Sequence, residues 1–80
     1  MNADAQAEIL AMAGVTADEL GQRLRRGWED WARMQPDAAE HPSWTRPWHL
    51  LDERDRVVDR QMAADLFCAG WVAARKAYRP

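Results

Sequence analysis

Cysteine is almost absent from this 80-residue chain, which contains only Cys68. An internal disulfide framework of the kind that staples small secreted domains is therefore excluded. Cys68 falls between the apolar residues Phe67 and Ala69, where a helical thiol is usually inert packing and not a nucleophile. We expect the protein to fold in a reducing compartment.

Long apolar runs and an excess of one charge are also missing. No segment approaches the roughly 18 apolar residues of a membrane span, and residues 1–4 lack the basic start of a secretory signal. The formal net charge is −2, from 11 basic and 13 acidic side chains. Nucleic-acid binding needs a clear basic excess on one face. We therefore expect no direct nucleic-acid binding, no membrane insertion and a cytoplasmic location.

Motifs that carry catalytic or metal chemistry are missing as well. The four glycines are isolated, so the sequence has no glycine-rich phosphate loop. His41 and His49 do not match the ligand spacings of structural zinc sites. Ser43 or Thr45 could act as a nucleophile only with a base beside its hydroxyl. We predict a protein that is not an enzyme and has no catalytic residue, no metal and no cofactor.

Start and stop signals for helices are well represented. Thr16 and Glu19 form a capping box, and Pro36 disfavours a helical conformation at the residue before it. The other signals are the expected N-caps Asp4 and Asp52 and the expected helix stop Gly14. The sequence predicts an all-α fold, a compact single domain of three helices at about residues 4–13, 17–34 and 53–78 with a loop at 35–52.

The second helix carries an apolar stripe that we expect to face the core. The stripe follows the i, i+4, i+8, i+11 spacing of one helix face and consists of Leu20, Leu24, Trp28 and Trp31. Gly21 and Gly27 each cost about 1 kcal/mol in a helix interior. We expect these glycines to admit a close neighbour, such as another element or a tryptophan.

Tryptophan and proline alternate in the loop before the third helix. The prolines, at positions 36, 42 and 47, prevent a long helix or strand. Trp44 and Trp48 indicate order, because disordered linkers have no core in which to place an indole. We expect both indoles to pack back on the helices, with Trp48 in the core.

Two neighbouring apolar stripes run along the third helix, together wider than packing on one side requires. One is Val58, Met62, Leu66, Ala69, Ala73 and Ala77; the other is Val57, Ala64, Phe67, Trp71, Ala74 and Tyr78. Either the tryptophan loop covers the surplus, or a partner or a second copy of the chain does. We favour the loop, because large exposed apolar patches are uncommon on monomers.

Arginines share one broad face of the second helix, at Arg23, Arg26 and Arg33. Such a face is usually solvated, here with Glu29 and Asp30 as pairing partners. The alternative is a surface that binds a phosphate or an acidic partner. Arginine and tryptophan are also the commonest anchors of protein interfaces. The candidate partner-binding residues are Arg23, Arg26, Arg33, Trp44 and Trp71.

The loop and the start of the third helix resemble the ryanodine-receptor-type repeat. The similar features are the His41-Pro42 turn, an aromatic residue soon after it, a Leu-x-x-Glu entry into a helix at Leu50 and an Asp near the first turns of that helix. The resemblance spans about residues 20–72. The Gly-Trp that precedes the loop in that family is replaced by Trp-Ala-Arg at 31–33.

Stand-alone copies of this repeat occur in bacteria and phages as small accessory proteins without catalytic residues, so the resemblance implies a binding module. The size and composition are also similar to those of phage proteins that act against host defence, including anti-CRISPR inhibitors. We expect an inhibitor that binds a host protein complex, such as a CRISPR surveillance complex, in the bacterial cytoplasm and blocks its engagement of target DNA. One alternative is a module that binds a nucleotide-like anion between the Trp44/Trp48 loop and the helix-two arginines. The other is a structural accessory protein that forms a homodimer through the third helix.

Overall fold

The computed structural model describes residues 1–78 and contains three α-helices and no strand in that range. The helices are α1 (Ala3–Ala13), α2 (Ala17–Arg33) and α3 (Glu53–Ala77). Three short 3-10 turns join α2 to α3, namely η1 (Ala38–Glu40), η2 (Pro42–Thr45) and η3 (Trp48–Leu50). The predicted all-α class, with an ordered loop rich in proline and tryptophan, is confirmed. The helix bounds agree with the predicted ones to within one residue.

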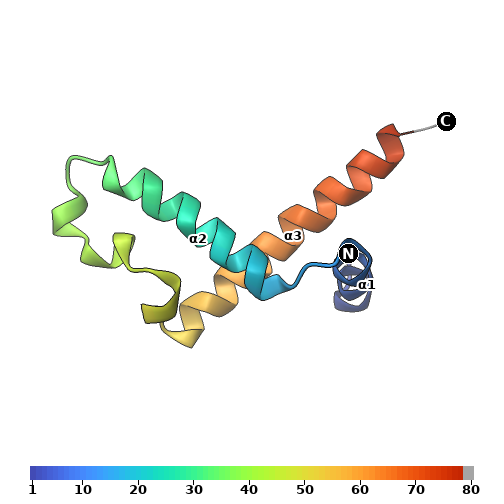
Figure 1. Cartoon of the computed structure of the whole chain (residues 1–80), viewed down its shortest axis with the longest axis horizontal. Helices are drawn as coiled ribbons and strands as arrows, with labels where there is room; N and C mark the ends of the chain where they lie inside the picture. Colours follow the sequence, from blue (N-terminus) through green and yellow to red (C-terminus); the bar gives the residue numbers. More distant parts are fainter. Residues whose placement is uncertain (79–80) are drawn as a thin grey trace.

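The three helices form an elongated molecule in which α2 and α3 cross (Figure 1). The first turns of α2 lie against α3, α1 packs on α3 at the other side of the crossing, and the C-terminal half of α3 projects away from α2. The principal extents are 50 × 25 × 19 Å, and the radius of gyration is 15.1 Å, whereas about 12 Å is typical of a chain of this length. None of the helices within residues 1–78 has the length and apolar character needed to cross a membrane.

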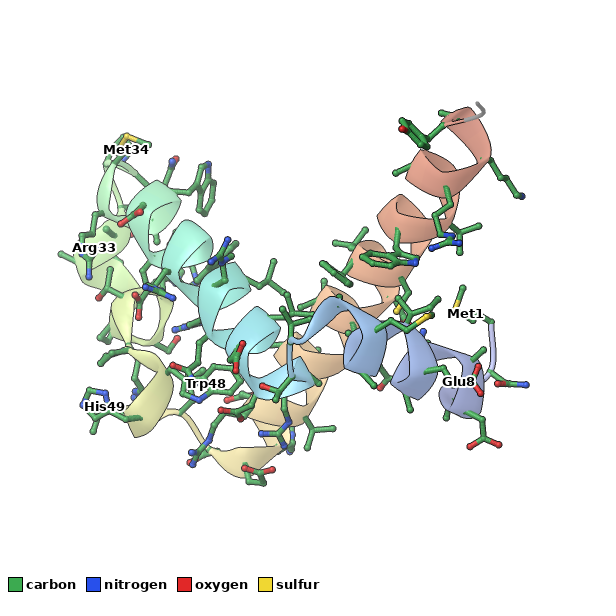
Figure 2. The ribbon with its side chains drawn as sticks, turned by 45° about the vertical axis from the view of Figure 1, so that its right-hand side comes forward. Met1, Glu8, Arg33, Met34, Trp48 and His49 are labelled. Atoms are coloured by element: carbon green, nitrogen blue, oxygen red, sulfur yellow. The ribbon has the colours of Figure 1, made fainter. Side chains whose placement is uncertain are left out.

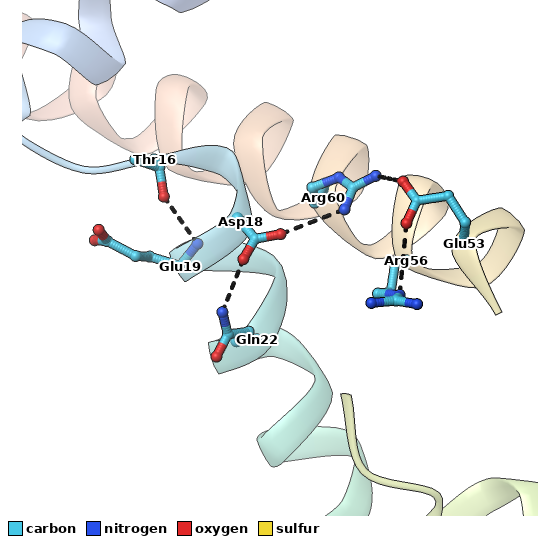
Figure 3. Close-up of polar contacts among 7 residues, drawn as sticks. All are labelled: Thr16, Asp18, Glu19, Gln22, Glu53, Arg56 and Arg60. Carbon is cyan, nitrogen blue, oxygen red and sulfur yellow. Dashed lines mark hydrogen bonds and ion pairs between the residues drawn. The ribbon is translucent and has the colours of Figure 1, made fainter. Parts of the chain in front are cut away.

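The ends of α1 and α2 use local hydrogen bonds that the sequence largely predicted. The backbone N–H of Glu19 donates to Thr16 Oγ1 at 3.0 Å, which caps α2 (Figure 3). Gly14 ends α1 with a φ of 69°, a conformation that residues with a side chain rarely adopt. The cap of α1 was predicted wrongly. Asn2, and not Asp4, accepts the N–H of Ala5 at 2.8 Å, because the helix begins at Ala3 and places Asp4 in its first turn.

Asp52 occupies the N-cap position of α3 but does not cap with its side chain. Its backbone carbonyl accepts the N–H groups of Asp55 and Arg56 at 3.0 and 3.1 Å. Asp52 was correctly predicted to be the N-cap residue, but the prediction that its side chain caps the helix was wrong. Glu53 and Asp55 in the first turn still place negative charge at the positive end of the helix dipole.

The core is built largely from small residues. Its buried apolar members are Ile9, Ala32, Leu51, Ala63, Ala64 and Cys68. Cys68 is only 1% exposed, and its Sγ lies 3.9 Å from the carbonyl oxygen of Gln6 on α1. The side chain of Gln6 also donates to Asp65. These contacts fasten α1 to α3 and confirm that Cys68 is a packing residue.

The tightest packing lies where Gly21 of α2 meets Trp48 of the loop and Arg60 of α3. A Cβ atom at position 21 would lie 2.8 Å from Trp48 Cη2 and 3.2 Å from the Cα of Arg60. The Arg60 guanidinium lies 6.0 Å from the Trp48 ring centroid and pairs with Asp18 and Glu53 (Figure 3). Trp48 is half-buried at this junction. The expected close neighbour is therefore present at Gly21, but the same expectation is wrong for Gly27, where an added Cβ would meet no atom of another described element within 4 Å.

The face that α2 buries differs from the predicted stripe. Gly21, Glu29 and Ala32 are buried, whereas Trp28 and Trp31 are 40% and 44% exposed. The prediction that these two indoles face the core is wrong, because the close approach at Gly21 turns the face that carries Gly21 and Ala32 inward. Trp28 and Trp31 are thereby turned partly outward, whereas Leu20 and Leu24 stay half-buried.

The apolar surplus of α3 is not covered by the loop, contrary to our expectation. Val58 and Met62 are each 51% exposed and Leu66 is 66% exposed. The loop turns η2 and η3 pack on α2 instead, because Gly21 offers the space that the Trp48 indole fills. One whole stripe of α3 therefore faces solvent.

Alanine substitution at the two interior glycines of α2 tests this packing. We expect Gly21→Ala to lower the free energy of unfolding by up to about 2 kcal/mol, because a steric cost of about 1–3 kcal/mol opposes a gain of about 1 kcal/mol in helix propensity. Gly27→Ala is the matched control, since an added Cβ would meet no described atom within 4 Å beyond its chain neighbours and the backbone of its own helix, and it should raise the free energy of unfolding by about 0.5–1 kcal/mol. Urea unfolding measures both. Equal stabilisation by the two variants would contradict the described crossing.

Candidate interaction surface

Three tryptophans gather on one side of the molecule, and we refer to Trp28, Trp31 and Trp44 as the tryptophan cluster. The ring centroids of Trp28 and Trp31 lie 4.9 Å apart, and Trp44 lies 6.0 Å from the first and 5.9 Å from the second. The rings are tilted or edge-on to one another, which is the preferred arrangement of aromatic pairs. Trp44 is half-buried, whereas the two helical indoles are exposed. The cluster thus presents a fixed aromatic surface to solvent.

Arg25 holds the loop side of this cluster in place. Its Nε donates to the carbonyl oxygen of Arg46 at 2.9 Å, and its Nη2 donates to the carbonyl oxygen of Ser43 at 2.6 Å. The same Nη2 lies 3.5 Å from the carbonyl oxygen of Trp44. A planar guanidinium can bridge these carbonyls because its donors diverge at fixed angles. Arg25 therefore ties η2 to the middle of α2 and fixes the backbone that carries Trp44.

His41 extends the aromatic surface by stacking on Trp44. The two rings are 4.0 Å apart and inclined by 9°. His41 Nε2 lies 3.5 Å from a carboxylate oxygen of Asp37, and possible ligand atoms of Asp37, Glu40 and His41 lie within 4.8 Å of one another. All three side chains are exposed or half-exposed. The arrangement orients the imidazole against the indole.

A pocket of about 280 Å³ opens beside the cluster, between α2, η2 and the start of α3. Its lining consists of Arg25, Trp28, Ser43, Trp44, Arg46, Leu51, Asp55, Val58 and Asp59. Partial burial raises the pKa of Asp59 above its ordinary value; the positive charge of Arg25 lowers that pKa, and the negative charge of Asp55 raises it further. The pocket is therefore mixed in polarity, with both a cation and carboxylates on its walls.

The residues predicted to bind a partner lie in separate places. Arg23 and Arg26 share a pocket of about 380 Å³ with Phe67. Arg33 lies at the far end of α2, where it pairs with Asp30 at 3.2 Å (Figure 2). Trp71 lines a third pocket, of about 470 Å³, on the projecting half of α3. Trp44 alone belongs to the tryptophan cluster.

The expected pairing of the arginines with Glu29 is wrong. Glu29 is buried, and its Oε1 has no hydrogen-bond partner among the described residues. Within residues 1–78, Asp30 is the one acid that pairs with an arginine of this face, Arg33. A buried carboxylate oxygen without a donor costs folding free energy.

Sequence reasoning missed Trp28 and Trp31 as surface residues because it assigned every large apolar residue of α2 to one inward stripe. A usable signal was nevertheless present. Gly21 and Ala32 are eleven residues apart and so share one face of the helix. When the smallest residues of a helix share a face, that face can make the closest contact, and the neighbouring large residues are left outside it.

Conservative replacement of Arg25 tests its role in holding η2. We expect Arg25→Lys to lower the free energy of unfolding by about 1–3 kcal/mol, because a lysine keeps the charge but cannot bridge the same carbonyls. The near-ultraviolet circular dichroism of the stacked indoles should weaken in parallel. Arg26→Lys, at the next and exposed position, should change neither signal. An Arg25→Lys variant as stable as the native protein would show that the loop is held by other contacts.

Comparison with known proteins gave no match, since no family model fits the chain and no curated protein or solved structure is significantly similar to it. The resemblance to the ryanodine-receptor-type repeat therefore stays a prediction.

Proposed function

We propose that this protein is a non-catalytic binding protein that docks on a partner protein through the tryptophan cluster. The observation that carries the proposal is the exposure of Trp28 and Trp31 side by side, 4.9 Å apart, on a helix that has an inward face available. Exposing two adjacent indoles costs solvation free energy that burial would recover. Tryptophan is also among the commonest energetic anchors of protein interfaces.

The rigidity of the cluster supports the proposal. Each exposed indole leans on another ring, and Trp44 is held both by its backbone, through Arg25, and by the stacked His41. Binding through side chains that are already ordered loses little conformational entropy. The partner surface that fits is an apolar groove with hydrogen-bond acceptors for the indole N–H groups.

The partner that we propose is a host protein complex, with a CRISPR surveillance complex as the first candidate. One observation supports a role as an inhibitor of this kind. The tryptophan cluster is bordered by charged side chains, because the pocket that Trp28 and Trp44 line is also lined by Arg25, Arg46, Asp55 and Asp59. An apolar centre with a charged rim is the usual layout of a protein interface. Inhibition would follow from covering a surface that target DNA must reach.

Removal of the two exposed indoles tests this proposal. The Trp28→Ala/Trp31→Ala variant should stay folded and should lose at least about 30-fold in affinity for the partner, since an anchor tryptophan contributes about 2 kcal/mol or more. The assay is binding of target DNA by a purified surveillance complex in the presence of native or variant protein. Met34→Ala, an exposed residue near the same end of α2, is the control and should behave like the native protein. Undiminished inhibition by the double variant would rule out this surface. If the native protein does not inhibit, the surveillance complex is excluded as the partner.

A second candidate function is the binding of a nucleotide-like anion, which the Arg23/Arg26 pocket favours. Two guanidinium groups border this pocket and the Phe67 ring contributes an aromatic wall, so charge and stacking are both available. The site differs from the predicted one, because the Trp44/Trp48 loop does not reach it. Titration calorimetry with nucleoside triphosphates should show binding that the Arg23→Ala/Arg26→Ala variant loses. An absence of heat with the native protein would leave the protein-binding proposal alone.

A further inference from the structure

The uncovered stripe of α3 is long and continuous. It consists of Val58, Met62, Leu66, Ala69, Ala73 and Ala77, all of them exposed. The opposite side of the helix is the one that packs, with Ala63, Ala64 and Cys68 buried under α2 and α1. Figure 1 shows that the C-terminal half of α3 stands clear of the other helices. The C-terminal half of the stripe is therefore open to another helix, and at its N-terminal end Val58 lines the mouth of the pocket between α2, η2 and α3.

The stripe has the same spacing in both directions. Its successive separations are four, four, three, four and four residues, so a two-fold axis between residues 67 and 68 places it on itself in the antiparallel sense. Its residue sizes are unequal about that axis. The large side chains occupy the N-terminal half and the alanines occupy the C-terminal half. An antiparallel copy opposes each large residue to a small one, in the pairs Val58 with Ala77, Met62 with Ala73 and Leu66 with Ala69.

From this size pattern we infer that α3 pairs antiparallel with α3 of a second copy of the chain. Large side chains facing small ones interdigitate and fill the space between two helices without voids. A symmetric dimer contact requires a surface that is complementary to itself, and this stripe meets that requirement in both spacing and size. A partner of different sequence would impose no such symmetry. The stripe meets the tryptophan cluster only at Val58, which also lines the pocket beside Trp28 and Trp44, and the inference does not depend on the proposed function.

The size of the contact sets the strength that the dimer should have. The 19-residue separation from Val58 to Ala77 corresponds to about 28 Å of helix, and the strip is about one helix, or 10 Å, wide. Such a strip covers about 280 Å² on each copy, well below the roughly 800 Å² per partner of a standard interface. The dimer is therefore weak and reversible, with a monomer–dimer equilibrium in the micromolar range or above.

Sedimentation velocity over a range of protein concentrations tests the inference. The weight-average mass should rise with concentration from the 9.2 kDa of one chain towards twice that value. Met62→Glu should weaken association at least tenfold, because it places a carboxylate in the stripe, and should leave the helical circular dichroism unchanged. Met34→Glu introduces the same change at an exposed methionine outside α3 and should associate like the native protein. A mass of one chain at all concentrations, or equal association of the two variants, would overturn the inference.

A size swap tests the antiparallel register. Ala69→Leu alone should weaken the dimer at least tenfold, because it opposes leucine to leucine where one large residue fits. Adding Leu66→Ala to the same chain restores one large and one small residue in each pair, so the swapped variant should again associate to within about threefold of the native protein. Failure of the swap to restore association, with the fold intact, would exclude this register.

Discussion

The close approach at Gly21 is the constraint on which the rest of the structure depends. It lets the backbone of α2 meet α3 at Arg60 and leaves space for the Trp48 indole, so one position joins both long helices and the loop. Arg60 adds an electrostatic clamp, because its guanidinium faces Asp18 on α2 and Glu53 on its own helix while lying near the Trp48 ring. These ion pairs are solvent-accessible, so they fix geometry more than they add stability.

The orientation of α2 follows from this contact and leads to the exposed surface. Once Gly21 and Ala32 face inward, Trp28 and Trp31 lie to the side and can bury only part of their area. The loop, held by Arg25, then brings Trp44 and His41 against them. The same set of contacts thus fixes the fold and orders the binding surface. The loop packs mainly on α2 and touches α3 near Arg60, which leaves the stripe of that helix uncovered.

Local signals predicted the helices well because caps and breakers act within a few residues. The Thr16 cap, the Gly14 stop and the loop prolines each impose a conformation that no tertiary contact needs to decide. Orientation about the helix axis was not predictable in this way. The hydrophobic stripe of α2 pointed to Leu20 and Trp28, whereas the close contact selected Gly21 and Ala32. The face of α2 that turns inward depends on contact with Trp48, which lies more than twenty residues from Gly21 in the sequence.

The candidate site was predictable to the same limited extent. Trp44 was recognised from composition and context, but its grouping with Trp28 and Trp31 depends on the path of the loop, which Arg25 fixes through backbone carbonyls. Hydrogen bonds from a side chain to a distant backbone carry no sequence pattern, because any residue supplies the acceptor. The three arginines share a helix face, so the sequence could not separate them. In the structure Arg23 and Arg26 lie beside Phe67 of α3, whereas Arg33 pairs with Asp30.

The central claim is that the free protein displays Trp28 and Trp31 while Trp48 is packed at the α2–α3 crossing. The most direct measurement is fluorine NMR of the protein labelled with 5-fluorotryptophan, with each signal assigned by single substitution and with a soluble paramagnetic agent added. We predict that the Trp28 and Trp31 signals broaden most and the Trp48 signal least. A Trp48 signal as strongly broadened as those of Trp28 and Trp31 would contradict the account.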